Sequence, residues 1–136
     1  MAKENGLAIT TLSVDDSAGT ARDIRNDITN FQFSTPRAVQ DVTGVDKSAN
    51  ERLLNLADFS ITLNGVFNDA ANLSHAVFRT VSSTSVNRTT SLDISGQTLA
   101  NECKYSDYNL TRGATGELTW TAPGALADGT VPTWGP

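Results

Sequence analysis

The chain has 136 residues, and its 10 Lys and Arg against 15 Asp and Glu give a formal net charge of −5 at pH 7. This length predicts one domain spanning residues 1–136, large enough to fold without disulfides or a structural metal. One Cys cannot form an intramolecular disulfide, one Cys and one His cannot complete a structural zinc site, and the acidic balance argues against duplex-DNA binding through a basic stripe.

The polar composition favours a mainly β protein. The chain contains 18 Thr, 12 Ser and 11 Asn, about 30% of its residues, and Thr favours strands whereas Ser and Asn favour turns. Apolar runs are too short to span a membrane. Residues 1–5 lack the apolar stretch of a secretory signal. We therefore expect synthesis and folding in a cytoplasm.

The first half of the chain predicts two strands and one irregular segment. Residues 7–14 and 28–34 read as strands, and the charged residues between them, 20–27, as an exposed connection. Residues 37–55 are less regular. Ser48 and Glu51 have the spacing of a helix capping box, so this segment is either a one- or two-turn helix or a loop.

The clearest strand is followed by the clearest helix. Apolar side chains alternate with polar ones over residues 58–67, which is the period of a half-buried strand. Over residues 71–81 the period changes, because Leu73, Val77 and Val81 recur every four residues. That spacing predicts a short amphipathic helix lying on a sheet.

The second half of the chain predicts three further strands and a tail. In residues 85–95 the polar Arg88 and Thr90 interrupt the apolar alternation, so this strand is expected to leave the core for solvent or a partner. Residues 98–112 switch parity near Tyr105, which predicts a bulge or bend. A strand over 117–122 places Trp120 inward. Pro123 and Gly124 then signal a turn, and residues 123–136 are expected to form an extended C-terminal arm.

These elements predict a mainly β fold, a two-sheet β sandwich or open barrel with one short flanking α-helix. The sequence offers few side chains in arrangements suited to catalysis or metal binding. His75 has no nucleophile at a catalytic spacing, and Cys103 lies on the apolar parity of a strand, where an inert buried thiol is expected. Asp15 and Asp16 suit a turn better than a metal site. We therefore predict no catalytic residue, no metal or cofactor site, and no enzyme activity.

Several stretches give the chain a family resemblance. Residues 41–49 (DVTGVDKSA), 56–68 (LADFSITLNGVFN), 107–112 (DYNLTR), 117–120 (ELTW) and 127–134 (ADGTVPTW) resemble the major tail proteins of siphophage-type tailed bacteriophages, notably phages of actinobacterial hosts. The similarity covers residues 7–134.

The resemblance implies the phage tail tube fold and a structural protein of the virion. Six copies would close into a ring, and rings would stack into a tube that conducts genomic double-stranded DNA into the host. Tape measure, tail terminator and tail tip proteins would be partners, and no membrane or cofactor would be involved. Six copies of −5 each give −30 per ring. From this charge we expect carboxylates along the channel to repel DNA phosphates over a screening distance of about 8–10 Å.

Contacts between rings and subunits are expected in the long irregular segment and at the chain ends. The candidates are Asp41, Thr43, Asp46, Lys47, Glu51, Arg52 and Trp134. The residues that face the channel cannot be assigned from the sequence. Three alternatives remain open: another virion β protein, such as a head decoration or tail-completion subunit; a carbohydrate-binding β-sandwich module; and, least favoured, a small hydrolase.

Overall fold

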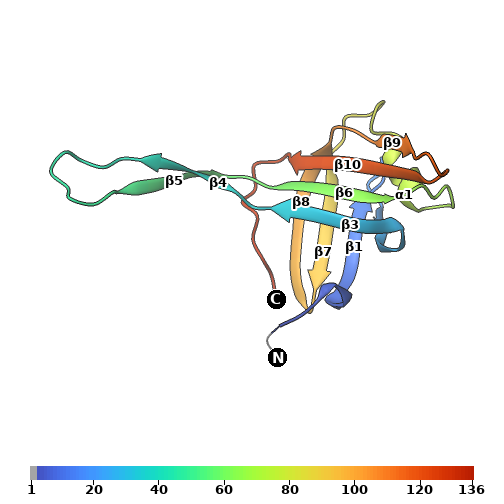
Figure 1. Cartoon of the computed structure of the whole chain (residues 1–136), viewed down its shortest axis with the longest axis horizontal. Coiled ribbons are helices and arrows are strands. Elements are labelled where there is room, and N and C mark those ends of the chain that lie inside the picture. Colours follow the sequence, from blue (N-terminus) through green and yellow to red (C-terminus); the bar gives the residue numbers. More distant parts are fainter. Residues whose placement is uncertain (1–2) are drawn as a thin grey trace.

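The computed structural model describes residues 3–136 and consists mainly of antiparallel β-strands (Figure 1). Eight strands form one sheet, and a two-stranded hairpin extends from it. The elements in chain order are η1 (Gly6–Ala8), β1 (Ile9–Asp15), β2 (Ala21–Asp23), η2 (Arg25–Asp27), β3 (Ile28–Ser34), β4 (Arg37–Asp41), β5 (Arg52–Ala57), β6 (Ser60–Val66), α1 (Ser74–Phe78), β7 (Arg88–Ile94), β8 (Gln97–Tyr105), β9 (Asn109–Arg112) and β10 (Leu118–Leu126).

The large sheet folds over on itself into two layers. Its strand order is β2-β1-β7-β8-β10-β6-β3, with β9 paired to β10. One layer holds β3, β6, β10 and β9; the other holds β2, β1, β7 and β8, and its strands cross those of the first (Figure 1). Strand β10 connects the layers, because it pairs with β9 over residues 118–121 and with β8 over residues 124–126. The fold is therefore the mainly β sandwich that the sequence predicts.

The core lies between the two layers and beneath the short helix. Trp120 is 1% exposed, and its Nε1 donates a hydrogen bond of 2.9 Å to the backbone oxygen of Val66. Gly65 lies directly against this indole: a Cβ atom there would be only 2.6 Å from the Trp120 ring. The alternation predicted for residues 58–67 is confirmed, since Phe59, Ile61 and Leu63 are buried on one face.

The predicted helix is present but shorter than expected. It covers only Ser74–Phe78, with Val77 and Phe78 buried. Its start is held by Asp27, whose carboxylate accepts hydrogen bonds from the backbone N of Ser74 (3.0 Å) and from Asn68 Nδ2 (2.8 Å). The prediction of an exposed connection over residues 20–27 is therefore wrong, because this segment contains β2, η2 and the buried Asp27 and Ile24.

The strand expected to leave the core at Arg88 and Thr90 remains inside it. Both residues are 2% exposed. The Arg88 guanidinium donates 3.0 Å hydrogen bonds to the backbone oxygens of Asp15 and Val77, and a 2.9 Å bond to Thr80 Oγ1. The Thr90 hydroxyl pairs with the Tyr105 hydroxyl at 2.7 Å. These polar groups are tolerated inside because elements distant in sequence satisfy their hydrogen bonds.

The C-terminal third confirms one prediction and corrects another. The bend expected near Tyr105 is present, because β8 ends there and β9 begins at Asn109. The turn expected at Pro123 and Gly124 is absent, since β10 continues to Leu126. Gly124 is buried against the Tyr105 ring, where a Cβ atom would lie 2.9 Å from that ring. The extended arm is thus shorter than predicted and begins after β10.

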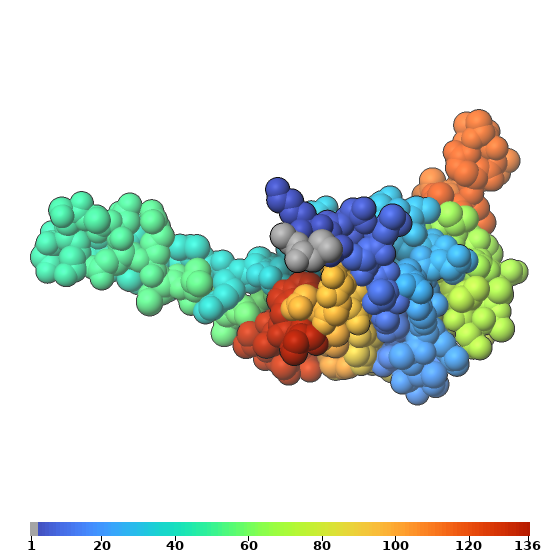
Figure 2. Space-filling model, turned by 90° about the horizontal axis from the view of Figure 1, so that it is seen from below, coloured from blue at the N-terminus to red at the C-terminus, as the bar shows by residue number. Residues whose placement is uncertain are grey.

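Residues 37–55 are not an irregular loop or a helix. Strands β4 and β5 form a hairpin that continues β3 and β6 beyond the sandwich. Figure 2 shows this hairpin projecting from one end of the body, while the turn between β9 and β10 projects at the other end. Ser48 and Glu51, whose spacing suggests a helix cap, lie instead in the hairpin's connecting loop.

Candidate assembly interface

The β4–β5 hairpin is almost entirely exposed to solvent. Every residue of β4 is exposed, and so is every residue of β5 except Ala57. Its register places Val39 opposite Leu54 and Asp41 opposite Arg52. Since the hairpin buries almost nothing in the subunit, its order points to a role in contacts outside the subunit.

Thr43 fixes the connecting loop at the start of the hairpin tip. Its Oγ1 accepts a 2.8 Å hydrogen bond from the backbone N of Glu51, and its own backbone N donates a 2.9 Å bond to Asp41 Oδ1. Hydrogen bonds from the Thr43 hydroxyl and backbone lower the pKa of Asp41, which keeps this carboxylate ionised. The tip therefore has a defined shape and negative charge.

The hairpin also carries a large share of the exposed apolar surface. Monomeric proteins seldom gather such surface in one place, and where they do it usually marks a contact site. Leu56 is 91% exposed, and Val45 at the tip is fully exposed. The other exposed large aliphatic residues of this segment are Val39, Val42, Leu53 and Leu54.

Six of the seven contact candidates lie together on this hairpin. Asp41 and Arg52 face each other across the strands, Thr43 and Glu51 are joined by hydrogen bonds, and the Lys47 ammonium lies 3.8 Å from the Asp46 carboxylate in the tip. The sequence prediction did not include the exposed aliphatic residues, although six Val and Leu residues between positions 39 and 56 in a polar, charged stretch are a signal of an apolar contact surface.

The seventh candidate, Trp134, lies apart from the hairpin tip and close to the hairpin's root. Its ring centroid is 6.0 Å from that of Phe33, near the end of β3 from which β4 continues. The neighbouring Gly135 forms an isolated bridge with Thr98, with N–O distances of 2.8 and 2.9 Å. The C-terminal tail is thus anchored to the body, while 45% of the Trp134 surface remains exposed.

Within residues 3–136, several strand edges have no partner strand in the subunit. β3 pairs only with β6, β9 only with β10, and β2 only with β1. Free edges expose backbone N–H and C=O groups and invite pairing with another chain. Of the three, β2 has only three residues, whereas β3 has seven.

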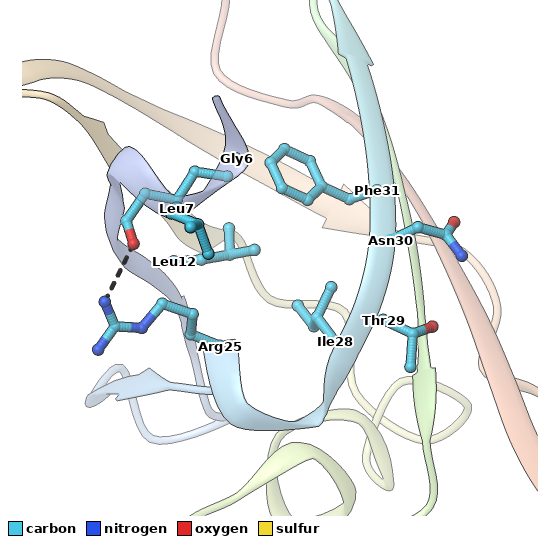
Figure 3. A pocket seen from close by; sticks show the side chains of 9 residues that line it. Gly6, Leu7, Leu12, Arg25, Ile28, Thr29, Asn30 and Phe31 are labelled. Carbon is cyan, nitrogen blue, oxygen red and sulfur yellow. Dashed lines mark hydrogen bonds between the residues drawn. The ribbon is translucent and has the colours of Figure 1, made fainter. Parts of the chain in front are cut away.

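A groove of about 460 Å³ opens between the start of β1 and β3 (Figure 3). Leu7, Leu12, Ile28 and Phe31 make its lining largely apolar. Arg25 closes one side by donating a 3.1 Å hydrogen bond to the backbone oxygen of Ile9. Among the described residues that line the groove there is no Cys, Ser, His, Asp or Glu.

The reactive side chains elsewhere are placed for packing. The Cys103 thiol is fully buried, and burial raises its pKa to about 11, which disfavours the nucleophilic thiolate. His75 lies in an aromatic cluster, with its Nδ1 3.3 Å from the Tyr108 hydroxyl and its ring 4.8 Å from that of Phe67. Within residues 3–136, no three His, Cys, Asp or Glu side chains are grouped as metal ligands. In the same range, no helix has the length and apolar character needed to cross a bilayer.

No protein-family model and no curated protein matches the chain. Its structure does resemble solved structures over nearly its full length. A chain in the virion of a native gene transfer agent particle aligns with a TM-score of 0.73 and 16% identity, covering 98% of this chain and 100% of that one. A chain in the tail of an empty gene transfer agent particle, refined helically with C6 symmetry, aligns with a TM-score of 0.74 and 18% identity over the same shares. The protein has the tail tube fold that its resemblance to phage tail proteins implies.

Proposed function

We propose that the protein is the major tail protein of a siphophage-type or related particle. Copies of it assemble into hexameric rings, and the stacked rings form a tube that conducts double-stranded DNA. The observation that carries this proposal is the full-length likeness to a chain from a C6-symmetric tail.

Ring formation gives the free strand edges a partner. In a heterologous ring each copy contacts its neighbours through two different surfaces, and closure leaves no edge free. The edges of β3 and β9 lie at opposite sides of one layer. Their pairing between neighbouring copies would make a continuous wall around a bore.

The β4–β5 hairpin would join one ring to the next. It continues in the direction of β3 and β6, away from the body (Figure 1). If those strands form the wall, the hairpin reaches past the edge of its own ring. Its exposed aliphatic side chains would be buried against the next ring. This burial would stabilise the contact by about 25 cal/mol for each Å² of apolar surface removed from water. Asp41, Thr43, Asp46, Lys47, Glu51 and Arg52 would set the register of this contact, with Trp134 bracing its root.

In an assembled tail the end rings would contact other proteins. The tail tip complex would nucleate the first ring, the tape measure protein would occupy the bore during assembly, and the tail terminator would cap the last ring. The protein itself would be part of the virion and would be made in the host cytoplasm.

Shortening the hairpin tests the proposal without disturbing the body. Gln40 lies opposite Leu53, so replacing residues 41–52 by Asn-Gly closes the strands with a two-residue type I′ turn. We expect this variant to fold with the thermal stability of the full-length chain but to form no tubes in electron micrographs. The matched control, Val66→Ala, alters an exposed aliphatic residue on β6 and should still give tubes.

The assembly state of the two proteins distinguishes the proposed function from its alternatives. Tubes from the shortened variant would remove the inter-ring role of the hairpin. Discrete rings or trimers from the full-length chain, seen in place of tubes, would favour a head decoration or tail-completion subunit. Monomers that bind glycans would favour a carbohydrate-binding module.

A further inference from the structure

One face of the β3-β6-β10-β9 layer points away from the core and carries no charged side chain. Side chains alternate between the two sides of each strand, and the cross-strand register aligns the outward ones in rows. We call this surface the neutral face. Its residues are Asn30, Gln32, Ser34, Ser60, Thr62, Asn64, Val66, Asn109, Thr111, Thr119, Thr121, Pro123 and Ala125.

The polar groups at the centre of the neutral face bond to one another across three strands. Asn64 Nδ2 donates to Asn30 Oδ1 at 2.7 Å, and Thr121 Oγ1 donates to Asn64 Oδ1 at 2.7 Å. Nearer one end, the hydroxyls of Ser34 and Ser60 are 3.1 Å apart. Such rows fix the side-chain positions and use up part of their hydrogen-bonding capacity.

The outward face of the other layer has the opposite character. Strands β2, β1, β7 and β8 place four carboxylates and one ammonium group on it. We call this surface the acidic face. Its charged residues are Asp15, Asp23, Asp93, Glu102 and Lys104.

The position of the free edges distinguishes the two faces. The layer behind the neutral face ends in a free edge on both sides, β3 and β9. Of the layer behind the acidic face, one edge is β2, which is three residues long, and the other is β8, which is joined to β10 over residues 103–105 and to the C-terminal tail at Glu102 and Thr98. The first layer is therefore the better suited to continue through both neighbours into a closed wall.

Building on the proposed function, we propose that the neutral face lines the bore and that double-stranded DNA passes along it, while the acidic face points outward. A wall without Lys or Arg offers no cation to pair with DNA phosphates, so DNA is not held by counterion release. The hydrogen bonds among Asn30, Asn64 and Thr121 occupy part of the donors of this wall, and the donors that remain are neutral amides and hydroxyls. Passage is then unhindered because the wall is uncharged, not because it repels DNA.

This arrangement differs from the expectation drawn from the net charge. That expectation places carboxylates of the −30 ring in the channel, whereas the neutral face contributes none of them. The carboxylates of the acidic face would instead lie on the outer surface of the tube, in contact with solvent. Within the bore, repulsion of DNA would be limited to residues that flank the strands, such as Asp58 and Asp107.

Thiol labelling of assembled tubes tests the orientation. Thr62 lies in the centre of the neutral face and Ala100 is exposed on β8, on the acidic face. Single variants Thr62→Cys and Ala100→Cys are treated with N-ethylmaleimide, which diffuses through a water-filled bore, and with maleimide coupled to a globular protein too large to enter it. The native Cys103 is fully buried, so unmodified tubes give the background.

We expect Thr62→Cys to react with both reagents in free subunits but only with the small one in tubes, whereas Ala100→Cys reacts with both in tubes. Labelling of Thr62→Cys tubes by the large reagent would place the neutral face outside and overturn the inference. So would resistance to both reagents, which would place it in a subunit contact. Failure of the unmodified chain to form tubes would instead count against the proposed function.

Discussion

The Trp134 indole packs on the Phe33 ring, 6.0 Å between centroids, and thereby ties the last residues of the chain to the strand from which the hairpin extends. Phe33 in turn lies 6.0 Å from the buried Phe59, so the tail is connected to the core through two aromatic contacts. The root of the projecting hairpin and the C-terminal tail are therefore one packed unit.

Replacing Trp134 should loosen this unit without unfolding the body. We expect Trp134→Ala to lower the free energy of unfolding by about 1 kcal/mol, because the ring is only half-buried. The backbone amides of Thr98 and Gly135, which bond each other's oxygens, should exchange hydrogen faster. Trp134→Phe keeps an aromatic contact and should retain most of the protection. Equal exchange rates in all three proteins would show that the indole does not anchor the tail.

Arg88 should be among the most sensitive positions for stability. Arg88→Ala leaves the backbone oxygens of Asp15 and Val77 without their donor and opens a cavity, which should cost about 3 kcal/mol. Arg79→Ala removes an exposed guanidinium on the same side of the fold and should change stability by less than about 0.5 kcal/mol. Denaturant unfolding measures both, and similar midpoints for the two variants would contradict this account of the Arg88 site.

Alkaline pH should destabilise the fold partly through Cys103. Burial raises the pKa of its thiol to about 11, so the folded chain keeps this proton at pH values where the unfolded chain has lost it. The stabilisation is fully present below the unfolded pKa, near 9, and is lost as the pH rises to 11, to a total of about 3 kcal/mol. Tyr108, whose pKa burial raises to about 12, adds a loss at higher pH.

Chemical unfolding of Cys103→Ala between pH 8 and 11 checks the sign of this effect. The variant starts from a lower stability because it lacks the sulfur, but its stability should fall less steeply with pH than that of the unmodified chain. Parallel curves for the two proteins would mean that the thiol ionises equally in the folded and unfolded states.

A ring of cations on the neutral face should slow DNA passage. Thr62→Lys places one ammonium group per subunit at the centre of that face, six per ring in a hexamer, and each can pair with a phosphate. We expect particles with this variant to eject DNA more slowly, and added salt to restore the rate. Two control variants should eject DNA at the rate of the unmodified particle. Thr62→Gln introduces a neutral side chain nearly as long as that of lysine, and Ala100→Lys places the ammonium group on the acidic face. Slow ejection from Ala100→Lys particles would assign the bore to the other face.

The parts of the fold that the sequence predicts are those where one face of a strand is buried in the subunit itself. Residues 58–67 alternate cleanly because Ile61 and Leu63 meet the core and Thr62 and Asn64 do not. The hairpin over residues 37–57 has no such face, since neither side of it is buried within the subunit. Its order depends on cross-strand pairing, which leaves only a weak alternation in the sequence.

Arg88 and Asp27 could not be placed from the sequence for a related reason. Each is buried because groups far along the chain bond to it: Asp15 and Val77 for Arg88, Asn68 and Ser74 for Asp27. A charged residue in a polar stretch of sequence is expected to be exposed. These two are buried because the tertiary structure brings hydrogen-bond partners to them. The exposure of residues 37–55 was predicted correctly although their strands were not, and the contacts expected of the residues there stay a prediction.

Cryo-electron microscopy of tubes assembled from the purified chain tests the central claim most directly. The account predicts stacked rings with sixfold symmetry, a bore walled by β3, β6, β10 and β9 with Thr62 facing the channel, and the β4–β5 hairpin seated on the adjacent ring. A closed globular oligomer without a bore, or a tube whose channel is lined by the carboxylates of β1 and β7, would contradict it.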